Sequence, residues 1–251
     1  MSAVRTGIVI QARLDSSRLP DKALLPLGGR PLIYRVMEAL RRVEADAYVL
    51  ASPEDCAAFF APLAEEAGFV FCPGPKEDVL ARYCVAIRRY SIDRVIRATA
   101  DNPFVFGDAA AAINAEALSL GADYAAYSGL PYGAGVESVS AEALLRAERE
   151  TPPPGRGPLP PEREHVCPYL YGHPELFLLH RPLAKREWRG PSLRISVDTA
   201  EDYERCLLLW DALAAGPPSG PPGGFPAGGE ALVAACRSLA AGGRPEFREP
   251  G

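Results

Sequence analysis

The chain has 251 residues, 48% of them hydrophobic and 24% charged, which is typical of a globular protein with a substantial core. A net charge of −5 argues against a protein that coats nucleic acid, because such proteins are usually basic. The six cysteines contain no CxxC pair, so we expect neither a zinc knot nor a disulfide framework. No apolar run is long enough for a signal peptide or a membrane span, and we expect a cytoplasmic protein.

Apolar runs alternate with helical patterns through the first half of the chain. Strands are expected at 6–11, 47–52, 69–73 and 93–100. Helices are expected at 31–43, 54–68, 77–90 and 107–121. Regular alternation with short connections predicts an α/β fold, in which a mostly parallel sheet carries helices on both faces.

The second half is less regular. Four short runs read as strands with antiparallel returns, and a helix follows at 199–216; the runs are DYAAYS (123–128), GVESVS (135–140), LFLLH (176–180) and SLRISV (192–197). The proline-rich segment 151–164 is expected to be a mobile loop. We expect one domain over 1–215 with an inserted lobe at about 125–190, a Pro/Gly linker at 216–229, and a short helix and tail at 230–251.

The connection after the first strand, QARLDSSRLPDK (11–22), is unusually cationic. It carries Arg13, Arg18 and Lys22 and few apolar groups. Ligands of open α/β sheets bind at the carboxyl ends of the strands, where this loop is expected to lie. Arginine forks and a compact lysine ammonium both suit a polyphosphate, so we interpret the loop as phosphate-binding. An ordinary solvated loop is the alternative.

Two aspartates end strands at the same predicted edge. Asp101 follows RATA (97–100), and Asp198 follows ISV (195–197). As a pair they are suited to a divalent metal that carries phosphate oxygens, whereas each alone is equally well explained as a strand-end or capping residue. Thr199 is expected to cap the next helix, and Asp202 to complement its dipole.

Several common catalytic motifs are missing from the sequence. It contains no GxxxxGK[ST], GxGxxG, HExxH or GxSxG, which disfavours P-loop, dinucleotide-binding, zinc-protease and serine-hydrolase functions. Cys84 lies inside a predicted helix and is expected in the core. His165 is the one histidine with a candidate catalytic role, although a lone histidine is more often structural.

The segment QARLDSSRLPDKALLPLGGRPLI (11–33) resembles the N-terminal signature of the CMP-sugar-acid synthetases, AR-x-x-S-x-R-L-P-x-K followed by L-x-G-x-P-L-I. Further blocks are similar to the spore-coat polysaccharide biosynthesis branch of the cytidylyltransferases. These blocks are EDVLARY (77–83), RATADNP (97–103), GAGVESVS (133–140), EREHVCPY (162–169) and SVDTAED (196–202). They occur in order over roughly residues 6–210.

This resemblance implies a nucleotide-diphospho-sugar transferase fold of the GT-A type, with a Rossmann-like mixed sheet. It implies Mg²⁺-dependent transfer of CMP from CTP to an acceptor, with release of pyrophosphate. Catalysis is then assigned to Arg13, Lys22 and Asp101, and the metal to Asp101 and Asp198. The nucleotide is assigned to Ala12, Arg13, Ser17, Arg18, Lys22, Ala51, Ser52, Asp78 and Ala100, and the acceptor to Arg82, Glu137, Arg163 and His165.

The leading functional hypothesis is a cytidylyltransferase that joins CMP to a sugar acid or related small acidic acceptor for polysaccharide assembly. A phosphate or phosphonate acceptor is one alternative. A GT-A glycosyltransferase is another, although the intact RLPDK segment (18–22) speaks against it. A non-catalytic nucleotide-binding subunit is disfavoured because Lys22, Asp101 and Asp198 are all present. No nucleic acid or membrane partner is expected, and the resemblance implies a homodimer formed through the inserted lobe.

Overall fold

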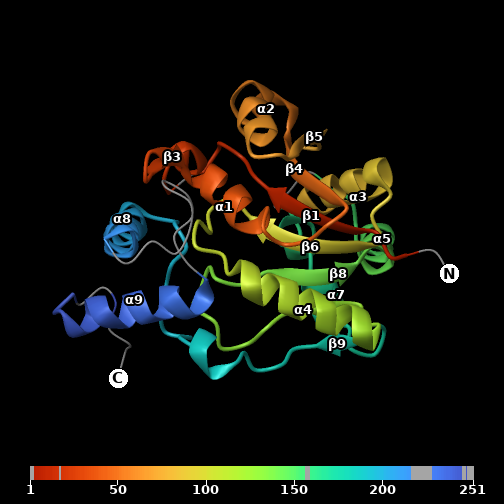
Figure 1. Ribbon diagram of the computed structural model, residues 1–251. Helices are drawn as coiled ribbons and strands as arrows, with labels where there is room; N and C mark the ends of the chain where they lie inside the picture. Colours follow the sequence, from red (N-terminus) through yellow and green to blue (C-terminus); the bar gives the residue numbers. More distant parts are fainter. Residues whose placement is uncertain (1–2, 17, 156–158, 216–227, 245–246, 248–251) are drawn as a thin grey trace.

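The computed structural model describes residues 3–16, 18–155, 159–215, 228–244 and 247. Its centre is a seven-stranded sheet in the order β5-β4-β1-β6-β8-β7-β9 (Figure 1). The strands are β1 (Thr6–Gln11), β4 (Ala47–Pro53), β5 (Val70–Gly74), β6 (Arg94–Thr99), β7 (Tyr124–Ala125), β8 (Glu137–Ser140) and β9 (Leu179–His180). β1 pairs in parallel with β4 and β6, whereas β8 runs antiparallel to β6 and β7. β2 (Pro26–Leu27) and β3 (Arg30–Pro31) form a separate small hairpin.

Helices cover both faces of this sheet (Figure 1). One face carries α1 (Leu32–Leu40), α2 (Ala57–Glu66), α4 (Gly107–Leu120), α8 (Ala200–Ala214) and α9 (Gly229–Ala241). The other carries α3 (Val79–Tyr90), α5 (Ala141–Glu150), the short α6 (Pro161–Glu164) and α7 (Pro168–Gly172). Three 3₁₀ turns, η1 (Lys22–Leu24), η2 (Glu54–Cys56) and η3 (Arg186–Trp188), complete the elements. The predicted α/β architecture is therefore confirmed.

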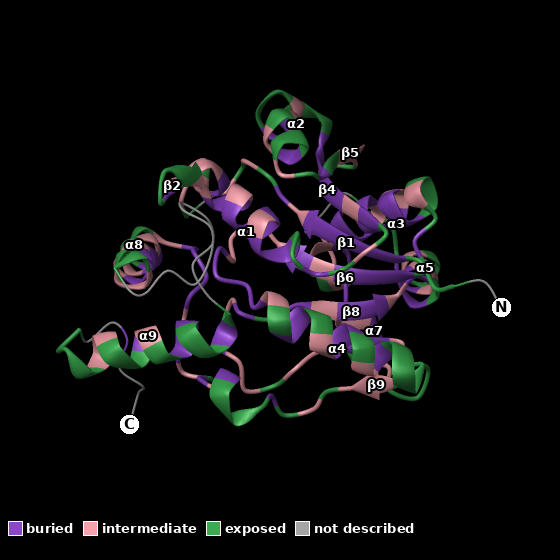
Figure 2. Ribbon diagram, in the orientation of Figure 1, coloured by how far each residue is buried: buried purple, intermediate pink, exposed green. Residues whose placement is uncertain are grey.

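The core is divided in two by the sheet, as the alternation of side chains along β1 requires. Ile8 and Ile10 pack into the cluster beneath α1 and α4, while Val9 packs into the cluster beneath α3 and α5. All three side chains are fully buried, and Figure 2 shows the central strands enclosed by the helices. A strand buried on both faces reads as the continuous apolar run seen at 6–11.

The second half of the chain departs from the sequence-based expectation. The strand predicted at 192–197 is wrong, because this segment bonds to loops instead of joining the sheet. Ile195 N donates to Tyr132 O at 2.9 Å, and Val197 N donates to Asp101 O at 2.8 Å. The helix α5 was not predicted, although Ser140 caps it by accepting a hydrogen bond from Ala143 N at 3.2 Å.

Helix α6 lies inside the segment that was expected to be a loop, 151–164. The predicted linker at 216–229 falls outside the described residues except for its last two glycines, which cap and begin α9. Among the described helices, none combines the length and the apolar character needed to cross a membrane.

Candidate active site

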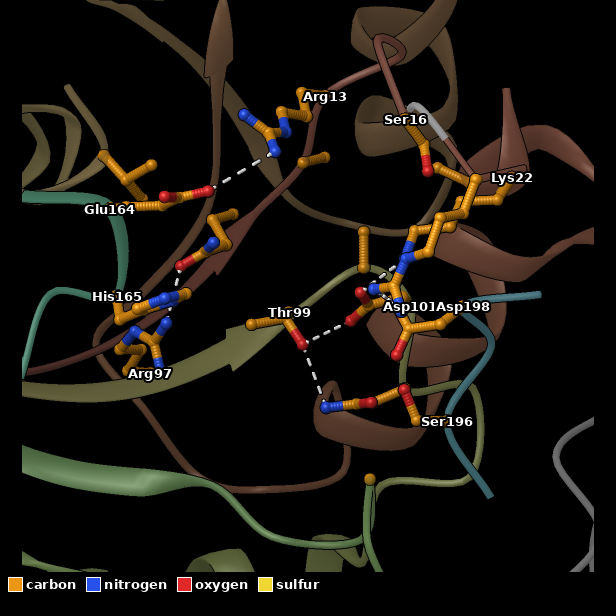
Figure 3. A pocket seen from close by; sticks show the side chains of 18 of the residues that line it. Arg13, Ser16, Lys22, Arg97, Thr99, Asp101, Glu164, His165, Ser196 and Asp198 are labelled. Atoms are coloured by element: carbon orange, nitrogen blue, oxygen red, sulfur yellow. Dashed lines mark hydrogen bonds and ion pairs between the residues drawn. The ribbon is translucent and has the colours of Figure 1, made fainter. Parts of the chain in front are cut away.

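A polar pocket of about 460 Å³ opens at the carboxyl ends of β1 and β6 (Figure 3). Segments far apart in the chain meet there, as expected for the ligand-binding edge of an open α/β sheet. The lining residues are Gln11, Ala12, Arg13, Ser16, Arg18, Lys22, Ala23, Val79, Arg82, Arg97, Thr99, Ala100, Asp101, Asn102, Tyr132, Gly133, Gly135, Glu164, His165, Ser196 and Asp198. We distinguish a carboxylate half around Lys22, Asp101 and Asp198 from an arginine half around Arg82 and Arg97.

Lys22 is the centre of the carboxylate half. Its Nζ lies 2.8 Å from Asp101 Oδ2 and 2.9 Å from Asp198 Oδ1, and it donates to the carbonyl of Val197 at 2.9 Å. Burial alone would lower the pKa of the Lys22 amine, but the two carboxylates outweigh it and raise that pKa. Lys22 is therefore held fully charged by both aspartates.

Each aspartate is oriented by its own neighbours. Thr99 Oγ1 donates to Asp101 Oδ1 at 2.6 Å, and Asn102 Nδ2 donates to Thr99 Oγ1 at 2.9 Å. Asp198 is bonded by Arg194 Nη2 at 2.6 Å and lies 3.2 Å from Arg18 Nη2. Although burial raises the pKa of Asp198, Lys22 and these arginines bring it below its ordinary value.

Helix α8 supports Asp198 from behind. Thr199 and Asp202 form a capping box at its start, which confirms the roles predicted for both residues. Asp202 Oδ2 also accepts a hydrogen bond from Asp198 N at 3.0 Å. Burial acts to raise the pKa of Asp202, but hydrogen bonds from Arg194 and Arg205 bring it to about 2.

The two pocket aspartates fit a divalent cation. Oxygens of both converge on one ammonium nitrogen, and Mg²⁺ characteristically takes one or two carboxylates together with phosphate oxygens and water. No cluster of three or more His, Cys, Asp or Glu side chains suited to a metal occurs in the described part of the chain. Phosphate and water oxygens would therefore complete the coordination.

The arginine half is built on the pairing of β6 with β8. Arg97 lies opposite Glu137 in the register, and its Nη1 forms an ion pair with Glu137 Oε2. Its Nη2 donates to Gln11 Oε1 at 2.9 Å, while Tyr124 OH donates to Glu137 Oε1 at 2.8 Å. Glu137 stands behind Arg97 and is not part of the pocket lining.

Arg82, on α3, is 1% exposed and lines the same half. Its Nη1 donates to Ala12 O at the long distance of 3.4 Å, and its Nε has no hydrogen-bond partner in the structure as described. Burial lowers the pKa of its guanidinium.

Most of the residues singled out from the sequence line the pocket. They are Ala12, Arg13, Arg18, Lys22, Arg82, Ala100, Asp101, His165 and Asp198. Ala51 and Ser52 are buried within β4 and are not part of the lining, and Ser17 lies outside the described residues.

Asp78 and Arg163 are also placed outside the lining, as partners of each other. Arg163 Nη1 lies 2.9 Å from Asp78 Oδ2, and both side chains are buried. Asp78 caps α3 through Ala81 N, and Arg163 donates to the carbonyl of Thr151 at 2.6 Å. Together they anchor the proline-rich segment against α3.

Sequence reasoning did not single out ten polar or glycine residues of the lining, namely Gln11, Ser16, Arg97, Thr99, Asn102, Tyr132, Gly133, Gly135, Glu164 and Ser196. Most lie inside the sequence blocks quoted above, so proximity to a recognised motif was the available signal. Gly133 has a φ of +94°, and a Cβ there would lie 2.7 Å from Ser196 N. This close approach requires glycine at the first position of GAGVESVS.

Known proteins resemble this chain in sequence and in fold. A family model described as cytidylyltransferase matches residues 7–209. The spore coat polysaccharide biosynthesis protein SpsF of Bacillus subtilis is 31% identical over 215 residues, covering 83% of this chain and 88% of SpsF.

Two solved structures show the same fold. A cytidylyltransferase from Leptospira borgpetersenii has a TM-score of 0.81 at 22% identity, covering 99% of this chain and 98% of its own. A CMP:2-keto-3-deoxy-manno-octonic acid synthetase complexed with CTP has a TM-score of 0.62 at 17% identity, covering 82% and 98%. The family model spans most of the chain, and SpsF is 31% identical over 83% of it. The protein therefore belongs to the cytidylyltransferase family of nucleotidyltransferases.

Proposed function

We propose that the protein transfers CMP from CTP to a small acidic sugar or related acidic acceptor, releases pyrophosphate and uses Mg²⁺. The observation that carries this proposal is the position of Lys22 Nζ, within 2.9 Å of both Asp101 and Asp198 at the edge of the sheet. Arg13 and Arg18 line the same pocket, so a triphosphate there would meet three cations from one loop. CTP as the nucleotide is supported by the family and by the CTP complex of the structural relative.

The transfer is an in-line displacement at the α-phosphorus. A hydroxyl of the acceptor attacks, the bond to the bridging oxygen breaks, and pyrophosphate leaves with the negative charge. Lys22 and Arg18 are placed to stabilise the charge that grows on the leaving group, because both cations line the site. Positioning and electrostatics therefore account for most of the catalysis.

Asp101 and Asp198 would hold the Mg²⁺. When bound, the metal would neutralise phosphate oxygens and so lower the barrier to displacement. Lys22 draws on the same two carboxylates for its counter-charge. The two aspartates would thus hold both Lys22 and the metal next to the phosphate that is transferred.

The acceptor would occupy the arginine half. His165 and Arg97 both line the pocket, and both are drawn on the opposite side of it from Lys22 (Figure 3). A surplus of guanidinium groups favours an acceptor with an acidic group.

The test is pyrophosphate release from CTP, UTP, GTP and ATP, each with Mg²⁺ and a panel of acidic sugars and phosphonates that includes 3-deoxy-manno-octulosonate. We expect release from CTP with an acidic sugar, and none from Lys22→Ala. Release only from a different nucleotide would contradict the assignment of CTP. Release only with phosphonates would replace the acceptor class.

A further inference from the structure

Arg82 and Arg94 differ from the other buried arginines that the structure describes, and of these two only Arg82 lines the pocket. Arg163 has Asp78 as its counter-ion at 2.9 Å, and Arg35 has Glu38 at 2.8 Å. No carboxylate of the described residues lies within 4 Å of the Arg82 guanidinium, although its side chain is as buried as that of Arg35. A buried charge without a counter-ion destabilises the free protein, and an anion bound in the pocket would offset this cost for Arg82.

The second observation concerns Arg97. The Nε of Arg97 is also buried without a hydrogen-bond partner among the described atoms, and Arg97 lines the same pocket as Arg82. Arg82 bonds to the carbonyl of Ala12 and Arg97 to the side chain of Gln11, so the two guanidinium groups approach consecutive residues at the end of β1. Glu137 is the one described carboxylate in ion-pair contact with either arginine. This region therefore carries an uncompensated positive charge that faces the pocket.

The carboxylate half has cations of its own for a bound triphosphate. Lys22 and Arg18 already stand there with Asp101 and Asp198, and that set is the one suited to a triphosphate and its metal. Arg82 and Arg97 reach the pocket from different elements, α3 and β6. They would form charge-assisted hydrogen bonds to a second, separate anion.

We infer that Arg82 and Arg97 form a receptor for an oxyanion of the acceptor, distinct from the triphosphate site. The inference rests on the proposed function and deepens it, since it assigns the residues that recognise the acidic group of the acceptor. The group is a carboxylate or a phosphate, both of which offer two oxygens to a guanidinium. Its binding anchors the acceptor while a hydroxyl elsewhere on the acceptor faces the α-phosphorus.

The experiment measures binding of two probe anions, pyruvate and inorganic phosphate, to protein saturated with CTP and Mg²⁺, with methyl pyruvate as the uncharged control. Saturation with CTP keeps the probes away from the triphosphate loop. The variants are Arg82→Met, which keeps the unbranched stem that packs against Gly74, and Arg82→Lys, which keeps the charge. Arg94→Met is the matched control, because Arg94 is also buried with an unpartnered Nε but lies outside the pocket lining.

We expect Arg82→Met to weaken binding of pyruvate, phosphate or both by about tenfold or more, as loss of a charge-assisted hydrogen bond predicts. Arg82→Lys should retain part of the affinity, and Arg94→Met all of it. Affinity for CTP should stay within about twofold in every variant, because these arginines do not face the triphosphate. Arg82→Met should also raise the melting temperature of the unliganded protein, since it removes a buried charge that lacks a partner.

Three results would overturn the receptor: wild-type protein that binds neither anion, an Arg82→Met variant that binds as wild type does, or an equal loss in Arg94→Met. Whichever probe binds identifies the oxyanion as carboxylate or phosphate. If no acceptor supports pyrophosphate release but anion binding depends on Arg82, the proposed function fails and the receptor stands. If turnover occurs with an acidic acceptor whose KM is unchanged in Arg82→Met, only the receptor fails.

Discussion

The two halves of the pocket differ in how their charged side chains are paired. In the carboxylate half, Lys22 is shared between Asp101 and Asp198, and Asp198 is contacted by two further arginines. In the arginine half, Arg82 has one long hydrogen bond to a carbonyl and no acidic partner among the described residues. The first half is a network of paired charges, whereas the second leaves Arg82 to be paired by the proposed anion.

Under the proposed function, this difference assigns turnover to the carboxylate half and acceptor recognition to the arginine half. A network of paired charges keeps cations in place before the substrate binds, so little reorganisation is needed at the reacting phosphate. A buried arginine without a counter-ion lowers the stability of the free protein but makes the pocket selective for an anionic ligand. Variants in the two halves should therefore separate turnover from acceptor recognition.

The largest effect is expected from Lys22→Ala. Loss of the ammonium that joins both aspartates should reduce pyrophosphate release by at least about 10³-fold, because a fixed charge at the leaving group is removed. Lys76→Ala is the matched control, since Lys76 forms an exposed pair with Asp55 at 2.7 Å and lies outside this pocket. Activity near the wild-type level in Lys22→Ala would contradict the assignment of the loop to the triphosphate.

Asp101→Asn and Asp198→Asn should each lower the Mg²⁺-dependent rate by about 10²-fold or more, since each removes a charged ligand from the proposed metal site. The two should differ in stability. Asp198 contacts Lys22, Arg18 and Arg194, whereas Asp101 has Lys22 as its ion-pair partner. Thermal unfolding should thus be affected more by Asp198→Asn. Unchanged dependence of the rate on Mg²⁺ in both variants would rule out the two-carboxylate site.

Asp202→Asn tests the support of the carboxylate half. The pKa of Asp202 is about 2 instead of 3.8, so its ionised form stabilises the fold above pH 4, and this stability is lost as the pH falls toward 2. At neutral pH the substitution should reduce the free energy of unfolding by about 2 kcal/mol. Urea unfolding between pH 2 and 7 measures this, with the exposed neighbour Glu201→Gln as control. Equal pH dependence in Asp202→Asn and wild type would show that the carboxylate is not the source.

The smallest effect is expected from His165→Ala. His165 lines the arginine half, so its loss should raise the KM for the acceptor by about three- to tenfold, the value of one hydrogen bond, and leave the KM for CTP unchanged. His173→Ala is the control, because His173 is bonded to Tyr169 O at 2.7 Å and is not part of the lining. Unchanged kinetics for the acceptor would make His165 a structural residue.

Local pattern was sufficient for much of the fold. The continuous apolar run at 6–11 became β1 with the predicted bounds, and the Thr199–Asp202 cap formed at the predicted helix start. The helical period and the capping rules depend on residues within a few positions of each other, so they can be read from the chain. The strand predicted at 192–197 did not form. An apolar segment joins a sheet only where the fold places an edge strand beside it, and that edge strand comes from a distant part of the chain.

The sequence by itself determined the family, the cationic loop and the pair of aspartates, since each of these is written in a short motif. Only the tertiary structure decided which charged side chains form ion pairs with each other. It paired Asp78 with Arg163 and Glu137 with Arg97, both outside the lining, and it left Arg82 facing the pocket without an acidic partner among the described residues. A charged side chain acts through its counter-ion and its burial, and the fold sets both by joining segments that are distant in the chain.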